Sequence, residues 1–323
     1  MSRTVMPLLI LGLLAVGLVS LAVPVDSLWP LWSDQRDLLG VILWELRLPR
    51  LILALIFGAS LGLTGAAIQA LFANPLASPD INGASGGAAL GAVVTGYTLG
   101  LGEGYGLTIG AIIGALLALA VLLGLAGRKA DSISFLLAGV AITAATGAAT
   151  ALALALAPSP FAFYDVYDWM MGSFVDRDLG QAALVAVIAL PALWIIAREA
   201  KALDHLVLGE VVAQSMGHDV PRLRLRIIIA SAIAIGACVS ICGAVGFIGL
   251  VAPFLARALT RQHPGRALVP AALIGAILLT TADVLVRFAP QGRNLPVGVL
   301  TALIGVPFFL WLVAGRRWQR GLG

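Results

Sequence analysis

The chain has 323 residues, of which 60% are hydrophobic and 11% are charged, and its formal net charge is +4. Soluble domains carry about 25% charged residues, so this composition excludes a soluble enzyme, a disordered chain and a nucleic-acid-binding protein. Two cysteines are too few for a disulfide scaffold. The sequence therefore predicts an all-α, polytopic membrane protein in which residues 1–323 form a single domain.

Charge-free apolar stretches recur along the whole chain, and a helix needs about 20 apolar residues to cross a bilayer. The stretch 227–256 is interrupted by Gly243, Gly246, Gly249 and Pro253, so we expect two helices there, the second one short. The first stretch exceeds the apolar core of a usual signal peptide, and we expect it to be retained as a helix. The ten predicted transmembrane helices are 5–23, 50–72, 81–99, 107–126, 133–156, 180–197, 227–243, 248–260, 267–286 and 296–314.

Ten spans place both termini on the same side of the membrane. If that side is the cytoplasm, fourteen of the 20 Lys and Arg residues lie in cytoplasmic segments and six lie outside. An excess of basic residues in cytoplasmic loops is the usual arrangement. We therefore expect a multi-pass protein with both termini in the cytoplasm.

Glycines recur at four-residue spacing inside the predicted spans, as in Gly58 and Gly62 or Gly106, Gly110 and Gly114. Small residues at this spacing let helix backbones approach closely in lipid. The pattern predicts tight helix packing and carries no information about a substrate.

The apolar spans hold almost no charge, whereas ion-coupled carriers usually keep acidic or His residues inside the membrane. His205, His218 and His263 fall in predicted cytoplasmic loops without metal-ligand spacing, and we expect them to be solvated. Cys238 and Cys242 predict a buried apolar pair. Neither a phosphate-binding loop nor a catalytic signature is present. We expect no metal, no cofactor and no catalytic residue, so energy for pumping would come from another chain.

The cytoplasmic insertion 199–226 differs from the other loops. Residues 210–216 have helical composition and Gly217 suits a C-terminal cap, while Asp219 and Pro221 suit the start of a second short helix. The insertion also holds more apolar residues than a solvated loop needs. Two interpretations remain open, a helix–turn–helix that enters a groove on a soluble partner and an ordinary loop packed on its own bundle.

Arginines stand on the predicted outer side, against the local charge bias. Arg47 and Arg50 can reach carboxylates on an external protein or anchor in lipid headgroups. Asp283 and Arg287 lie four residues apart near an outer helix end. They can pair along the helix, or Arg287 can face an outside partner.

Several motifs follow one another in order between about residues 40 and 314. They are RLPR at 47–50, GASLGLTG at 58–65, FANPLASP at 72–79, NGASGG at 82–87, LAGV at 137–140, WMMGS at 169–173, LGE at 208–210, AQSMG at 213–217, GAVGFIGLVAP at 243–253 and LPVGVLTALIGVP at 295–307. Together they resemble the FecCD family, the permease subunits of bacterial ABC importers for iron chelates, haem and vitamin B12.

This resemblance implies the type II permease fold of ABC importers, with ten helices per subunit. It further implies a homodimer in the bacterial inner membrane, two copies of a cytoplasmic ABC ATPase and a periplasmic substrate-binding protein. The permease itself would not be an enzyme, because ATP hydrolysis belongs to the separate ATPase.

The resemblance also assigns roles to individual residues. The resemblance implies that the binding protein docks on Arg47, Arg50 and Arg287, through one glutamate on each of its lobes. ATPase coupling, within coupling helices at 199–226, falls to Gly209, Glu210, Ala213, Met216 and Gly217. The cytoplasmic gate falls to Asn74, Pro75 and Leu76, and the pathway candidates on the fifth span are Thr143 and Thr146.

The sequence leaves the cargo open. A ferric siderophore is the first expectation because that class is commonest in the family, with haem and cobalamin next. The alternatives from other classes are an ion-coupled secondary transporter and an intramembrane enzyme. Both would need polar groups inside the spans that the sequence barely supplies.

Overall fold

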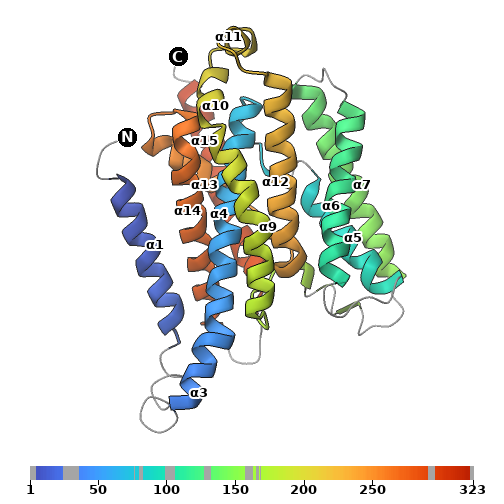
Figure 1. The fold of residues 1–323 in the computed structure, drawn as a ribbon, viewed down its shortest axis with the longest axis vertical. Coiled ribbons are helices and arrows are strands. Elements are labelled where there is room, and N and C mark those ends of the chain that lie inside the picture. Colours follow the sequence, from blue (N-terminus) through green and yellow to red (C-terminus); the bar gives the residue numbers. More distant parts are fainter. Residues whose placement is uncertain are drawn as a thin grey trace.

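A computed structural model describes residues 5–24, 36–75, 77–79, 83–98, 106–126, 132–156, 163–164, 167, 169–289 and 295–320. Within these ranges the regular elements are all helices and no strand occurs (Figure 1). Most of the helices run back and forth between two ends of one elongated bundle. The all-α prediction is confirmed.

Each of the ten predicted spans corresponds to one described helix. These helices are α1 (Val5–Ala22), α4 (Leu48–Leu71), α5 (Ala84–Thr98), α6 (Gly106–Ala126), α7 (Ser132–Ala155), α9 (Leu179–Arg198), α12 (Val220–Cys242), α13 (Ile248–Leu259), α14 (Pro264–Val286) and α15 (Val297–Arg320). Six of them are long and apolar enough to cross a membrane, and α5, α6, α13 and α15 contribute shorter apolar segments.

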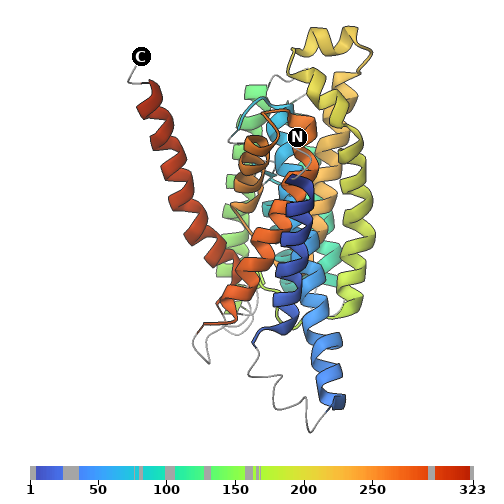
Figure 2. The same cartoon turned by 90° about the vertical axis from the view of Figure 1, so that its left-hand side faces the viewer.

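Short helices mark the two ends of the bundle. At one end, α3 (Arg36–Val41) and the π-helix η2 (Ile42–Arg47) continue α4 beyond its neighbours. At the other end lie α10 (Ala200–Leu206) and α11 (Glu210–Ser215). We call these two ends of the bundle the α3 end and the α11 end. Helix α1 begins and α15 finishes toward the α11 end (Figure 2), as an even number of spans requires.

The start of α12 differs from the prediction. The span was expected from residue 227, with Asp219 and Pro221 opening a separate short helix, but these two residues begin α12 itself. The Asp219 carboxylate accepts a hydrogen bond from the Arg222 backbone N–H at 3.1 Å and so caps the helix. Hydropathy marks only the apolar part of a helix, whereas the charged turn at 222–226 belongs to the same continuous helix.

The predicted break between α12 and α13 is confirmed at Gly243 and Gly246, whereas Gly249 and Pro253, also expected to interrupt the helix, lie inside α13. The chain leaves α12 at Gly243, whose φ is +72°, and a Cβ on this residue would lie 1.9 Å from the Trp169 carbonyl oxygen. Helix α13 has only 12 residues, so its length of about 18 Å covers little more than half of a hydrocarbon core of about 30 Å. Residues 243–247 therefore place non-helical backbone inside the bundle, beside the segment around Trp169.

Close backbone contacts hold the central helices together. On α4, a Cβ added to Gly62 would lie 2.0 Å from the Ala271 carbonyl oxygen, and one on Gly58 would lie 2.4 Å from the Gly275 carbonyl oxygen of α14. Gly91 of α5 approaches Gly110 of α6 in the same way. The spacing of small residues thus predicted real helix crossings, in which dispersion contacts between backbones replace the missing hydrophobic effect.

Gly62→Ala should destabilise the bundle by about 1–3 kcal/mol, because the added methyl overpacks a rigid crossing. Thermal unfolding of the purified protein in detergent would measure the loss. Gly124→Ala in α6 is the matched control, since a Cβ there meets nothing within 4 Å. Equal unfolding temperatures for the two variants would contradict this account of the crossing.

Candidate functional site

Three arginines gather around one carboxylate at the α3 end. Arg50 Nε donates to Asp283 Oδ1 at 2.8 Å and to Oδ2 at 3.0 Å, and Arg287 Nη2 donates to Oδ2 at 2.5 Å. The Asp283 side chain is 0% exposed, and Arg47 lies beside this group as the last residue of η2. The pairing of Asp283 with Arg287 along the helix is confirmed. We call these four residues the arginine cluster.

Two of the arginines also bind the C-terminal turn of α1. Arg47 donates to the carbonyl oxygens of Leu21 at 2.6 Å and Pro24 at 3.0 Å. Arg287 donates to the carbonyl oxygens of Ser20 and Val23 at 2.5 and 3.0 Å. These side chains therefore face into the chain. The structure brings the three predicted docking residues together, while their docking role stays a prediction.

The coupling candidates lie at the α11 end, and two glycines set the bounds of their helix. Gly209 precedes α11 with a φ of +103°, and Gly217 follows it with a φ of +88°. Only glycine adopts such dihedrals without a steric penalty. The predicted helix at 210–216 and its cap at Gly217 are confirmed, because Gly217 N–H also bonds back to the Gln214 carbonyl at 2.9 Å.

One face of α11 and the turn before it form an exposed apolar surface. Val211 is 80% exposed and Met216 is 50% exposed, whereas Ala213 is fully buried against the bundle. Val207 and Leu208, for which the sequence predicted no role, extend the same surface and are 66% and 62% exposed. We call Val207, Leu208, Val211 and Met216 the apolar patch. Of the two interpretations left open for this insertion, the outward-facing patch favours docking to a partner.

Polar contacts tie the patch to the bundle. Glu210 Oε1 accepts from Arg224 Nη2 of α12 at 2.7 Å. The ring nitrogens His205 Nδ1 and His218 Nε2 lie 2.8 Å apart, and both side chains are half-buried. The expectation of solvated histidines is therefore wrong for this pair, because a helix–turn–helix brings positions 13 residues apart into contact. Among the described residues, no group of three or more His, Cys, Asp or Glu side chains could hold a metal ion.

The gate candidates Asn74 and Pro75 lie in the turn after α4, and Leu76 lies outside the described residues. The Asn74 backbone N–H donates to the Gln69 carbonyl at 3.1 Å. The side-chain amide oxygen of Gln69 accepts from Arg257 Nη2 of α13, and Gln69 is 1% exposed. The turn is thus attached to the buried contact between α4 and α13, although its gating role stays a prediction.

The two pathway candidates on α7 have different surroundings. Thr143 is exposed and donates to the Gly139 carbonyl at 2.9 Å. Thr146 donates to the Ile142 carbonyl at 2.8 Å and lies against Gly86 of α5. Only Thr143 lies on the open side of the helix, and a pathway role for either residue stays a prediction.

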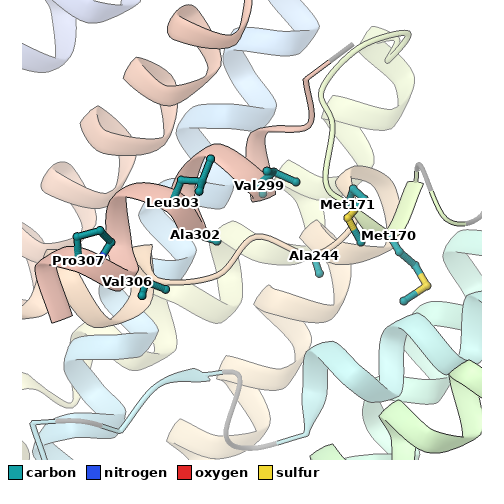
Figure 3. Close-up of a pocket in the computed structure, with 9 residues that line it drawn as sticks. Met170, Met171, Ala244, Val299, Ala302, Leu303, Val306 and Pro307 are labelled. Carbon is teal, nitrogen blue, oxygen red and sulfur yellow. The ribbon is translucent and has the colours of Figure 1, made fainter. Parts of the chain in front are cut away.

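An apolar cavity of about 540 Å³ lies beside the first half of α15 (Figure 3). It is lined by Met170, Met171, Ala244, Gly298, Val299, Ala302, Leu303, Val306 and Pro307. Its walls are joined by backbone hydrogen bonds, from Val297 N–H to the Gly172 carbonyl at 2.9 Å and from Ser173 N–H to the Cys242 carbonyl at 2.8 Å. No charged side chain is among these lining residues, so the cavity suits a bulky organic molecule rather than a bare ion.

Comparison with known proteins gives consistent matches over nearly the whole chain. The model of the FecCD transport family matches residues 7–315. The chain is 36% identical to the vitamin B12 import system permease protein BtuC of Vibrio cholerae, over 87% of this chain and 84% of that protein. It is 38% identical to BtuC of Salmonella typhi, over 96% of this chain and 95% of that protein.

A solved structure has the same fold. It is described as an inward-facing conformation of a metal-chelate type ABC transporter, and it matches with a TM-score of 0.84 and 27% identity. The match covers 95% of this chain and 97% of that one. The type II permease architecture expected from the sequence is therefore confirmed.

Asp283→Asn should cost about 3–5 kcal/mol of stability, because buried Arg50 and Arg287 lose their shared counter-charge while the side-chain volume is kept. Thermal unfolding in detergent would report the loss. Asp219→Asn is the matched control, since this side chain is exposed and asparagine also caps a helix. An Asp283→Asn protein as stable as the wild type would show that the cluster does not depend on the carboxylate charge.

Proposed function

The chain belongs to the FecCD transport family and is the membrane permease of an ABC importer, and we propose that its cargo is a cobalamin of the vitamin B12 type. The observation that carries this proposal is the identity of 36–38% to permeases named for vitamin B12 import, over 87–96% of the chain. ATP is hydrolysed by a separate ATPase chain, so this subunit is a conduit and not an enzyme. The uncharged cavity beside α15 is consistent with a bulky metal complex wrapped in organic ligand.

A ferric siderophore, the first expectation from the sequence, is the second candidate. It is supported by the similarity in fold to a transporter described as metal-chelate type. Both cargoes are metal ions enclosed in large organic ligands, so the same apolar walls serve either. The higher identity to the vitamin B12 permeases favours cobalamin.

We place the α3 end in the periplasm and the α11 end, with both termini, in the cytoplasm of a bacterial inner-membrane protein. The excess of basic residues toward the α11 end supports this orientation. In it the arginine cluster faces a periplasmic binding protein and the apolar patch faces the ATPase. The cluster carries three guanidinium groups and one carboxylate, so its charge is complementary to acidic side chains on a docking protein.

A homodimer is supported by helices that leave much of their surface uncovered. Only 22% of the apolar part of α7 is buried within the chain, and α15 diverges from the bundle toward the α11 end (Figure 2). A second copy packed on this side would enclose a pathway between Thr143 and the cavity of each protomer. Small and apolar walls would let a bulky cargo pass without binding tightly.

Coupling follows from how the helices connect the two ends. Helix α12 begins beside Glu210 and His218 and finishes at Cys242, whose carbonyl holds the cavity wall through Ser173. A displacement of the 199–226 coupling helices by the ATPase is therefore transmitted along α12 to the cavity. The gate turn at Asn74 and Pro75 would respond through Gln69 and Arg257.

The alternative of an ion-coupled carrier loses support from the structure. A proton relay needs an acidic group inside the membrane that can exchange its proton. Asp283 is the fully buried acidic residue among the described spans, and both of its oxygens accept hydrogen bonds from arginines. Both oxygens of this carboxylate are therefore already used as acceptors in ion pairs with arginine.

Uptake of cobalamin into liposomes should require the ATPase, the loaded binding protein and ATP hydrolysis. The measurement is accumulation of radiolabelled cobalamin by the reconstituted complex, with a hydrolysis-deficient ATPase as the control. Accumulation driven by an ion gradient without ATP would refute the importer. Uptake of a ferric siderophore with no competition by cobalamin would refute the proposed cargo alone.

Val211→Glu should weaken binding of the ATPase by at least about thirtyfold, because truncating or charging a central apolar anchor costs about 2 kcal/mol or more. Co-purification and a titrated pull-down would measure this. Gln214→Glu is the matched control, since it adds the same charge on α11 at an exposed position outside the apolar patch. Equal ATPase binding by both variants would remove the patch from the interface.

A further inference from the structure

Hydrogen bonds from arginine side chains attach helix α1 to the bundle at its C-terminal end. Its leucines 8, 11, 14 and 18 are 59–69% exposed, and Ser20 is its one buried residue. Figure 1 shows α1 standing at the side of the bundle next to α14. The opposite face of α1 packs on α14, where Gly12 approaches Ile277, and the polar contacts of the helix lie around Ser20.

Those contacts are made by the arginine cluster. Arg47 and Arg287 together donate to four backbone carbonyls between residues 20 and 24, and Arg287 Nη2 also donates to Ser20 Oγ at 2.9 Å. The last turn of a helix has unpaired carbonyls and carries the negative end of the helix dipole. The C-terminal turn of α1 therefore presents oxygen acceptors and partial negative charge to these guanidinium groups, as a carboxylate would.

The charge balance of the cluster explains why such a partner is needed. Asp283 neutralises one of three guanidinium groups, and the Arg287 side chain and Arg47 are each only 7% exposed. A buried cation without a counter-charge destabilises the folded protein. The α1 turn supplies part of the missing negative charge. Arg50 instead donates to both oxygens of Asp283, and its side chain is 17% exposed.

We propose that the C-terminal turn of α1 is an internal ligand of the arginine cluster, which carboxylates of the docking binding protein displace. This inference rests on the proposed docking role of the arginines. An outside carboxylate meets Arg50 first, because it is the most exposed of the three. It engages Arg47 and Arg287 only when residues 20–24 leave them, so docking frees the periplasmic end of α1.

Cysteine labelling tests the displacement directly. Ser20→Cys places a thiol at a fully buried position, and the native Cys238 and Cys242 are both 0% exposed, so the background of labelling is low. The reconstituted permease–ATPase complex is treated with a membrane-impermeant thiol reagent, with and without the loaded cognate binding protein. Ala22→Cys, at an exposed position of the same turn, is the matched control.

The expected result is a labelling rate at Ser20→Cys that rises at least tenfold, as an order of magnitude, on docking, while the rate at Ala22→Cys is unchanged. An unchanged rate at Ser20→Cys, with the binding protein shown to be bound by co-elution, would overturn the displacement and leave the docking role intact. Failure of the binding protein to associate with the unmodified complex would overturn both.

A second variant uses affinity as the readout. Ser20→Ala removes one acceptor from Arg287, and a hydrogen bond to a charged group is strong enough that its loss should lower the Kd for the binding protein by about tenfold. Val19→Ala, on the exposed side of α1, should leave this Kd unchanged. Weaker docking by Ser20→Ala would contradict competition, because it would mean that the α1 turn supports the docking geometry.

Discussion

Lipid offers no hydrogen bonds, so polar groups inside this bundle depend on partners supplied by the protein. The constraint is visible where the structure departs from plain apolar helices. Asp283 is enclosed by two arginines, the hydroxyl of Thr64 returns to the Ser60 carbonyl at 2.6 Å, and the unwound segment after Cys242 bonds to its neighbours through Ser173. The same constraint brings the end of α1 to the arginine cluster.

Two long helices, α14 and α12, connect one end of the bundle to the other. The first turn of α14 receives Asp204 of α10, whose Oδ1 accepts from the Gly265 N–H at 2.8 Å, and its last turn holds Asp283. Helix α12 runs in parallel from the apolar patch to the cavity wall. Each is a continuous helix of 23 residues. An ATPase and a binding protein docked as proposed would therefore act on opposite ends of the same two helices.

Hydropathy and glycine spacing predicted the helices well because both report on contact with lipid or with another backbone. They placed the break after Cys242 and the crossing at Gly62, but they misplaced the start of α12, where charged residues such as Arg222 continue a helix that has left the apolar region. The contact between His205 and His218 was also missed. It depends on the angle of the turn between α10 and α12, and composition does not encode that angle.

The arginines show the limit of sequence reasoning most clearly. Their positions at one helix end were predictable from spacing and topology, and the pairing of Asp283 with Arg287 was one of two possibilities that the sequence left open. Their second partner was not, since residues 20–24 precede Arg287 by more than 260 positions and offer backbone carbonyls and the Ser20 hydroxyl. A carbonyl acceptor leaves no mark in a sequence. Yet such an acceptor decides whether an arginine can meet an incoming protein at once or must first release a partner of its own. Under the proposed displacement, that difference would make docking of the binding protein move the end of α1.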